Sequence, residues 1–138
     1  MIVHQQLPHA LPYVLAASVV AILAYDAISA AIVRGRPSFR YGRLWPLQFG
    51  CYVVIGFVAM YFLLDIRLTG IVGAITGLVE ATAGWAITWR MGPNRQPQAT
   101  RGSMLVAVLS MVAFGFGLAL LGALIFNVAV RVVLRAPI

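Results

Sequence analysis

Two carboxylic acids lie inside apolar stretches of this sequence, and they are its first candidates for chemistry. Glu80 lies within the glycine-rich run 70–85, and Asp26 lies in an alanine-rich run nearer the N-terminus. Both runs have membrane-spanning length, and ionisable side chains inside a membrane are costly and usually functional. No arginine lies at the depth of either acid, so we expect at least one of them to hold a proton at neutral pH.

Four polar side chains, one in each apolar run, fall at a similar distance from a basic segment. Each is eight to ten residues from the nearest arginine of a basic segment, which at ~1.5 Å per helical residue places them at one depth. The four are Asp26, Tyr52, Glu80 and Ser110. If they face inward they form a polar layer, which either binds a proton or cation or joins helices by hydrogen bonds.

Small residues predict where the helices pack. Glu80 shares a helical face with three glycines, and such glycines let another helix approach closely. These glycines are Gly73, Gly77 and Gly84. An alanine stripe of the same kind lies in the first apolar run, at Ala17, Ala21 and Ala24. We therefore expect both sets to be helix-packing positions.

The composition predicts an all-α integral membrane protein, a four-helix bundle in a single domain over residues 1–138. The chain is 62% hydrophobic and 9% charged, whereas a soluble domain has roughly 25% charged residues. The expected spans are 13–33, 46–64, 68–89 and 103–130, with a tight turn at 65–67. Pro12 suits the start of the first helix. The last span is longer than a bilayer requires, so it should tilt, kink near Gly115 and Gly117, or project.

The arginines orient this bundle, since all ten basic residues are arginine. The loops 34–45 and 90–102 are rich in arginine, so the positive-inside rule places them in the cytoplasm. The chain then forms two helical hairpins with both termini outside, in the inner membrane of a bacterium. Seven arginines would anchor it to lipid headgroups: Arg34, Arg36, Arg40, Arg43, Arg90, Arg95 and Arg101.

Other chemistry has little support in the sequence. His4 and His9 are too few for a closed metal site, so we expect neither metal nor other cofactor. No histidine lies within a span to activate a nucleophile, so we do not expect an enzyme. The arginines flank apolar runs instead of lining one face, which argues against nucleic-acid binding. Asn127 is expected to hydrogen-bond to a neighbouring helix.

These patterns favour a small non-enzymatic membrane protein that acts through helix contacts. It would be an accessory or assembly subunit of a membrane complex, or a homo-oligomer, with lipids and other membrane subunits as partners. The alternative is a small oligomeric transporter or channel that is coupled to protons or cations through Glu80 and Asp26. The small-residue stripes favour the first interpretation, and the buried acids favour the second.

Overall fold

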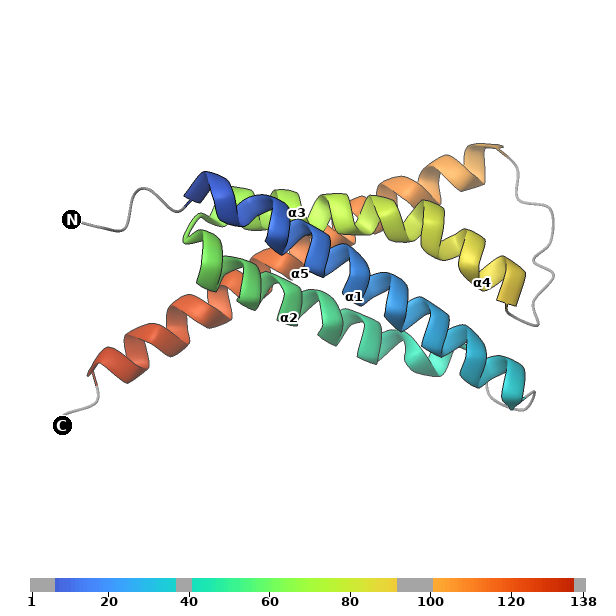
Figure 1. The fold of residues 1–138 in the computed structure, drawn as a ribbon, viewed down its shortest axis with the longest axis horizontal. Coiled ribbons are helices and arrows are strands. Elements are labelled where there is room, and N and C mark those ends of the chain that lie inside the picture. Colours follow the sequence, from blue (N-terminus) through green and yellow to red (C-terminus); the bar gives the residue numbers. More distant parts are fainter. Residues whose placement is uncertain (1–6, 37–40, 92–100, 136–138) are drawn as a thin grey trace.

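The computed structural model describes residues 7–36, 41–91 and 101–135, and over these residues the chain is helical, without strands (Figure 1). The main helices are α1 (Leu7–Gly35), α2 (Trp45–Leu63), α3 (Ile66–Val79), α4 (Trp85–Met91) and α5 (Arg101–Arg135). A 3-10 turn, η2 (Tyr41–Leu44), precedes α2. A π-helical turn, η3 (Glu80–Gly84), joins α3 to α4.

Four helical stretches are long and apolar enough to cross a membrane, which confirms the predicted number of spans. They are His9–Gly35, Trp45–Leu63, Ile66–Ile87 and Gly102–Val133. The third stretch combines α3, η3 and the start of α4. The prediction that the first helix starts at Pro12 is wrong, because α1 begins at Leu7 and contains Pro12. The ring removes one backbone N–H donor from the helix and leaves the helix continuous.

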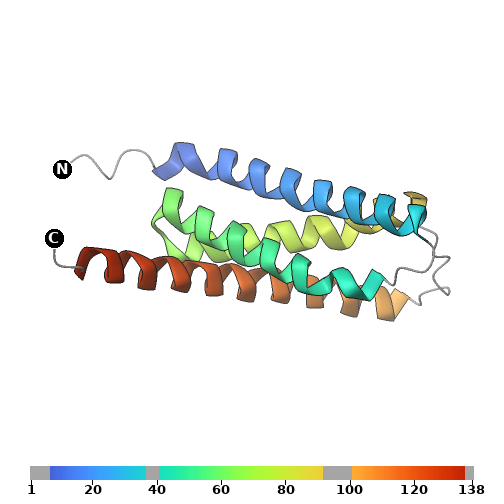
Figure 2. The same ribbon diagram turned by 90° about the horizontal axis from the view of Figure 1, so that it is seen from below.

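The helices lie in three layers. In Figure 2, α2 and α3 form the middle layer, with α1 on one face and α5 on the other. Helix α5 packs along both α2 and α3, whereas α1 packs on α2 and on α3, η3 and α4. The start of α1 and the end of α5 lie at the same end of the bundle (Figures 1 and 2).

A tight turn joins α2 to α3, where the sequence predicts one. Leu64 adopts a left-handed conformation with a φ of 51° and ends α2. The Asp65 carboxylate then caps α3, since its Oδ1 accepts from the N–H groups of Arg67 at 2.7 Å and Leu68 at 3.2 Å. Such a cap satisfies backbone donors that the first helical turn leaves free.

Glycines hold α5 directly against the middle layer. A Cβ atom added at Gly73 would overlap the carbonyl oxygen of Gly115, and one added at Gly77 would overlap that of Met111. The predicted packing glycines of α3 therefore meet the α5 backbone. Two further glycines make backbone contacts between α2 and α5, namely Gly56 and Gly122. In lipid, such close approach provides the dispersion contacts that hold helices together.

The alanine stripe lies outside the packed part of α1. The inward face of α1 consists of Val14, Ser18, Ile22, Asp26, Ser29, Ala30 and Val33. Ala17 and Ala21 lie one position away from this face and Ala24 lies two positions away, and all three are exposed. The stripe therefore makes no close packing within the chain, and its role as a helix contact stays a prediction.

Helix α5 is a single α-helix of 35 residues that runs unbroken through Gly115 and Gly117. At ~1.5 Å per residue it is roughly 50 Å long, well beyond the ~30 Å of hydrocarbon in a bilayer. It crosses behind α3 obliquely in Figure 1. Asn127 does not bond to another helix as predicted, because its Nδ2 donates to the Ala123 carbonyl of α5 at 3.0 Å.

We expect Gly115→Ala to lower the free energy of unfolding by about 1–3 kcal/mol, because the new methyl group overlaps the Gly73 carbonyl oxygen. Gly117→Ala is the matched control, since a Cβ there meets nothing within 4 Å. It should be neutral or stabilise by up to about 1 kcal/mol through helix propensity. Unfolding by SDS from mild-detergent micelles measures both, and equal effects would contradict the close contact.

Candidate functional site

Glu80 is the first residue of the π-turn η3 and is only 6% exposed. Its Oε2 accepts a hydrogen bond from the Tyr52 hydroxyl, and its Oε1 accepts one from the Gln48 side-chain amide. Both donors belong to α2 and are four residues apart, so they share a helical face. Glu80 therefore joins the two helices of the middle layer through both of its carboxyl oxygens.

Tyr52 is held in place from the other side by α5. The side chain is 1% exposed, and a Cβ added at Gly115 would lie 3.1 Å from its ring atom Cε1. The same glycine that lets α5 approach α3 therefore leaves room for the phenol ring. Gly115 thus affects both the packing of α5 and, through Tyr52, the orientation of the Glu80 carboxyl group.

Asp26 is the second buried acid and is 3% exposed, on the inward face of α1. Its Oδ2 is buried and has no hydrogen-bond partner. This oxygen lies against Gly84, where a Cβ would overlap Asp26 Oδ2 and lie 3.3 Å from the Cγ of Glu80. Both carboxyl side chains therefore border the same glycine, although they belong to helices in different layers.

The π-turn places Glu80 and Gly84 together at this point. The backbone N–H of Trp85 bonds to the carbonyl of Glu80, five residues earlier, where a regular helix would use four. The Thr82 hydroxyl donates to the carbonyls of Leu78 at 2.9 Å and Val79 at 3.2 Å, where the bonding pattern changes. Single π-turns inside α-helices are frequent at functional sites.

Polar groups around the pair are mostly neutral. The Tyr25 hydroxyl of α1 donates to the carbonyl of Leu44 at 2.7 Å and so ties α1 to the start of α2. No basic side chain pairs with either acid within the described residues. The same part of the chain contains no group of three His, Cys, Asp or Glu residues that could hold a metal ion. The site is thus two buried acids, of which Glu80 accepts hydrogen bonds from two neutral donors.

Three of the four predicted layer residues come together, and Ser110 does not. Ser110 is exposed on α5, and its hydroxyl donates to the Val106 carbonyl of the same helix at 2.7 Å. The predicted depth is close, since the next residue, Met111, contacts Gly77. The depth of a residue along a helix does not determine the side of the helix on which it lies. The prediction that Ser110 belongs to the polar layer is therefore wrong.

Gln48 supplies the polar contact that Ser110 does not, and sequence reasoning missed it. A signal was present, because Gln48 precedes Tyr52 by one helical turn and so shares its face. Gln48 was not grouped with the four predicted layer residues because it lies only five residues from Arg43, whereas they lie eight to ten residues from an arginine. The bond from Tyr25 to Leu44 had no comparable signal, since its acceptor is a backbone carbonyl.

Most arginines of the described residues lie at the end of the bundle where α1 and α4 end and α2 and α5 begin (Figure 1), whereas Arg67, Arg131 and Arg135 lie toward the opposite end. Four of the predicted anchors are exposed there: Arg34, Arg36, Arg43 and Arg90. Arg101 begins α5, and Arg40 and Arg95 lie outside the described residues. At the opposite end, His9 is exposed at the start of α1, and His4 lies outside the described residues.

The chain matches no protein-family model, no curated protein and no solved structure. Its class therefore follows from its own helices. Four candidate membrane-spanning helices indicate a multi-pass membrane protein.

We expect Tyr52→Phe to lower the free energy of unfolding by about 0.6–2 kcal/mol, because it removes one donor to Glu80 and keeps the ring. Tyr61→Phe on the same helix is the control, since that side chain is 60% exposed. Unfolding by SDS, followed by tryptophan fluorescence, measures both variants. A Tyr52→Phe protein as stable as the control would mean that the bond adds nothing to the fold.

Proposed function

We propose that this chain is a small, non-enzymatic inner-membrane protein that acts through helix contacts. It would serve as an accessory or assembly subunit of a membrane complex, or as a homo-oligomer. The observation that carries this proposal is the exposed alanine stripe of α1, defined by Ala17, Ala21 and Ala24. Small residues are enriched where membrane helices meet, because they let two backbones approach.

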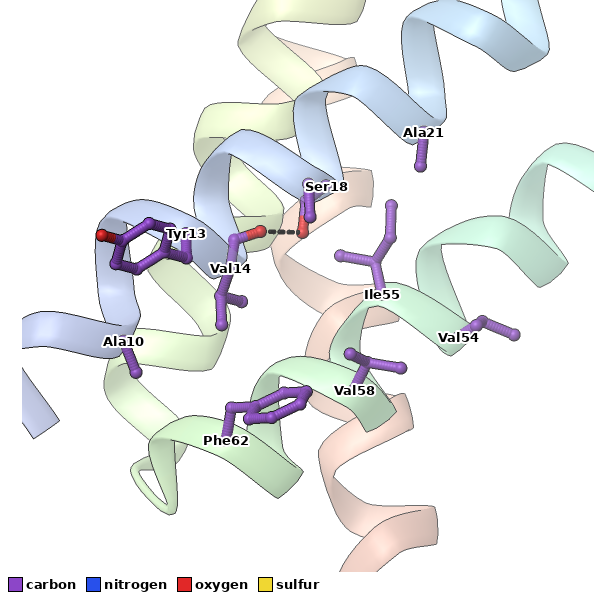
Figure 3. A pocket seen from close by; sticks show the side chains of 10 residues that line it. Ala10, Tyr13, Val14, Ser18, Ala21, Val54, Ile55, Val58 and Phe62 are labelled. Carbon is purple, nitrogen blue, oxygen red and sulfur yellow. Dashed lines mark hydrogen bonds between the residues drawn. The ribbon is translucent and has the colours of Figure 1, made fainter. Parts of the chain in front are cut away.

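A groove beside the stripe supports this proposal. Figure 3 shows it between α1 and α2, with side chains from both helices along its walls. Its lining residues are Ala10, Tyr13, Val14, Ala17, Ser18, Ala21, Val54, Ile55, Val58 and Phe62. Two lining residues carry hydroxyl groups: Tyr13 is 77% exposed, and Ser18 donates to the Val14 carbonyl of its own helix at 2.8 Å. The groove therefore presents small and apolar groups, which suits another apolar helix.

The use of small residues inside the chain supports the same interpretation. The glycines of α2, α3 and α5 make backbone contacts within the bundle, whereas Ala17, Ala21 and Ala24 of α1 are exposed. Exposed positions elsewhere carry large apolar side chains, such as Leu105 and Leu109, which suit contact with lipid. A stripe of alanines is better matched to a helix than to lipid.

We further propose that the basic end of the bundle faces the cytoplasm and that both termini lie outside. The argument is the positive-inside rule, applied to the loops that follow α1 and α4. Two helical hairpins then cross the membrane, with their loops at the anionic headgroups of the inner leaflet.

The orientation predicts that alkaline phosphatase fused after residue 138 is active, because this reporter folds only outside the cytoplasm. The same reporter fused after residue 96, in the second basic loop, should be inactive. A fluorescent protein that matures in the cytoplasm should give the opposite pattern at the two positions. Active phosphatase at residue 96 would reverse the proposed orientation.

We expect Ala21→Leu to release the chain from its complex, because a larger side chain separates the two backbones at the stripe. Ala113→Leu is the matched control, since Ala113 is also exposed but lies on α5. Native electrophoresis and co-purification in mild detergent measure the assembly, and a tenfold loss of the larger species corresponds to about 1.4 kcal/mol. A wild-type chain that is monomeric and without partners in detergent and in lipid nanodiscs would refute the proposal.

A second candidate function is favoured by one specific observation, the buried pair of acids. Carboxyl groups inside membrane proteins commonly carry protons or cations in transporters. On this alternative, the chain would be a small oligomeric transporter or channel, coupled to protons or cations through Glu80 and Asp26. Helix association would then assemble the transport path, because four helices make a thin bundle.

A further inference from the structure

We propose that Asp26 and Glu80 form a binding site for one monovalent metal cation beside Gly84, and that the cation binds in exchange for a proton. The site lies inside a single chain, between α1 and the π-turn η3. It therefore goes beyond the proposed role in helix contacts, which concerns the outer face of α1.

The unpartnered oxygen of Asp26 is the main evidence for a ligand. Asp26 Oδ2 is fully enclosed, and no donor of the described chain reaches it. A buried polar atom without a partner is unfavourable, and native structures rarely contain one. The partner of this oxygen must therefore come from outside the chain, as a water molecule or a cation.

A proton alone does not satisfy this oxygen. Protonation of the other Asp26 oxygen would neutralise the side chain, but Oδ2 would still accept no hydrogen bond from the described chain. A water molecule would donate a bond to Oδ2 but carries no charge, so protons would be needed as well to make the pair neutral. A bound cation does both, since it coordinates the oxygen and neutralises charge where no basic side chain reaches.

The other oxygen atoms at the site suit a hard cation, which prefers oxygen ligands. Each Glu80 oxygen accepts one hydrogen bond from α2, and a carboxylate oxygen has a second lone pair. Gln48 and Tyr52 are then positioning residues that hold the carboxyl group of Glu80. Gly84 has no side chain, so Asp26 Oδ2 lies directly against its backbone, at a place that a Cβ would otherwise fill.

The charge balance favours a monovalent ion. Two protons make the empty pair neutral. One monovalent cation that replaces one of these protons also leaves the pair neutral, with the second proton shared between the carboxyl groups. A divalent cation would displace both protons, and it would find no third acid among the described residues. Binding should therefore release one proton for each cation.

The other titratable groups near the pair are two phenols and a thiol. Tyr25 of α1 and Cys51 and Tyr52 of α2 are the neighbours that interact with the acids. A phenol or thiol in its ordinary form carries no charge below about pH 8. On α4, Arg90 lies six residues beyond Gly84 and is exposed. In the described part of α5, the titratable side chains are arginines near the ends of the helix. The two carboxyl groups therefore remain as the groups that exchange the proton.

Binding of radioactive sodium ion to the purified full-length chain in detergent tests the proposal. Choline chloride keeps the ionic strength constant, and the assay is run at pH 6, 7 and 8. We expect saturable binding of one sodium ion per chain. Its affinity should rise by about tenfold per pH unit while the pair holds the exchangeable proton, because each bound cation releases one proton.

Variants that keep the shape of the site separate a cation site from a structural role. Asp26→Asn and Glu80→Gln are nearly isosteric and should each abolish saturable sodium binding. Gly84→Ala should weaken binding at least tenfold, because its methyl group overlaps Asp26 Oδ2. Asp65→Asn is the matched control, since this acid caps α3 at the turn and should bind sodium like wild type.

The proposal is overturned if no saturable binding occurs at any of the three pH values, or if Asp26→Asn binds as wild type does. In the first case, water or protons alone serve the oxygen. Circular dichroism and gel filtration identify variants that fail to fold. Where a variant fails to fold, the pH dependence of sodium binding by the wild-type chain decides instead, since a pH-independent affinity also overturns the exchange. The state of assembly is measured separately, so either proposal can fail without the other.

Discussion

The hydrogen bonds that Glu80 accepts from α2 are the interaction on which the interior of this bundle depends. Lipid offers no hydrogen-bond partners, so polar groups in the spans must find partners in the protein. Glu80 meets this constraint through Tyr52 and Gln48, one turn apart on the facing helix. The bonds fix the rotation of the middle helices. As a result, Gly84 lies against Asp26, and Tyr52 lies beside the glycine through which α5 packs.

Two kinds of small residue serve different purposes in this chain. Glycines occur where helices of the same chain touch through their backbones, as at Gly73 and Gly115. Alanines form an exposed stripe on α1, the helix that lies on the other face of the middle layer (Figure 2). The glycines therefore set the shape of the monomer, whereas the alanines leave a surface that the monomer does not use. Glycines thus mark contacts inside the bundle, and the alanine stripe of α1 marks the surface proposed for contact with another helix.

The sequence predicted the fold more fully than the site, for a physical reason. Apolar length fixes the number of spans, and distance from a basic loop fixes depth, so Asp26, Tyr52 and Glu80 could be grouped. Rotation about each helix depends on tertiary packing, which is why Ser110 was misplaced and Gln48 was missed. The π-turn at Glu80 had no sequence signal, because a hydrogen bond over five residues instead of four depends on tertiary packing, here of η3 against α1 and α5. Likewise, the alanine stripe of α1 differs from its buried face by only one or two positions.

The π-turn also affects how this chain can change in length over evolution. In a regular α-helix, insertion of one residue rotates everything beyond it by roughly 100°. The segment Glu80–Gly84 contains such an extra residue and absorbs it locally. A related chain with one residue fewer here could form a regular helix instead. The part before this point would keep its contacts to α5, and the part beyond it would keep its basic end. Such a chain would lose the π-turn that bears Glu80 and Gly84, so length variation at this point would separate chains with the carboxyl site from chains that keep only the scaffold.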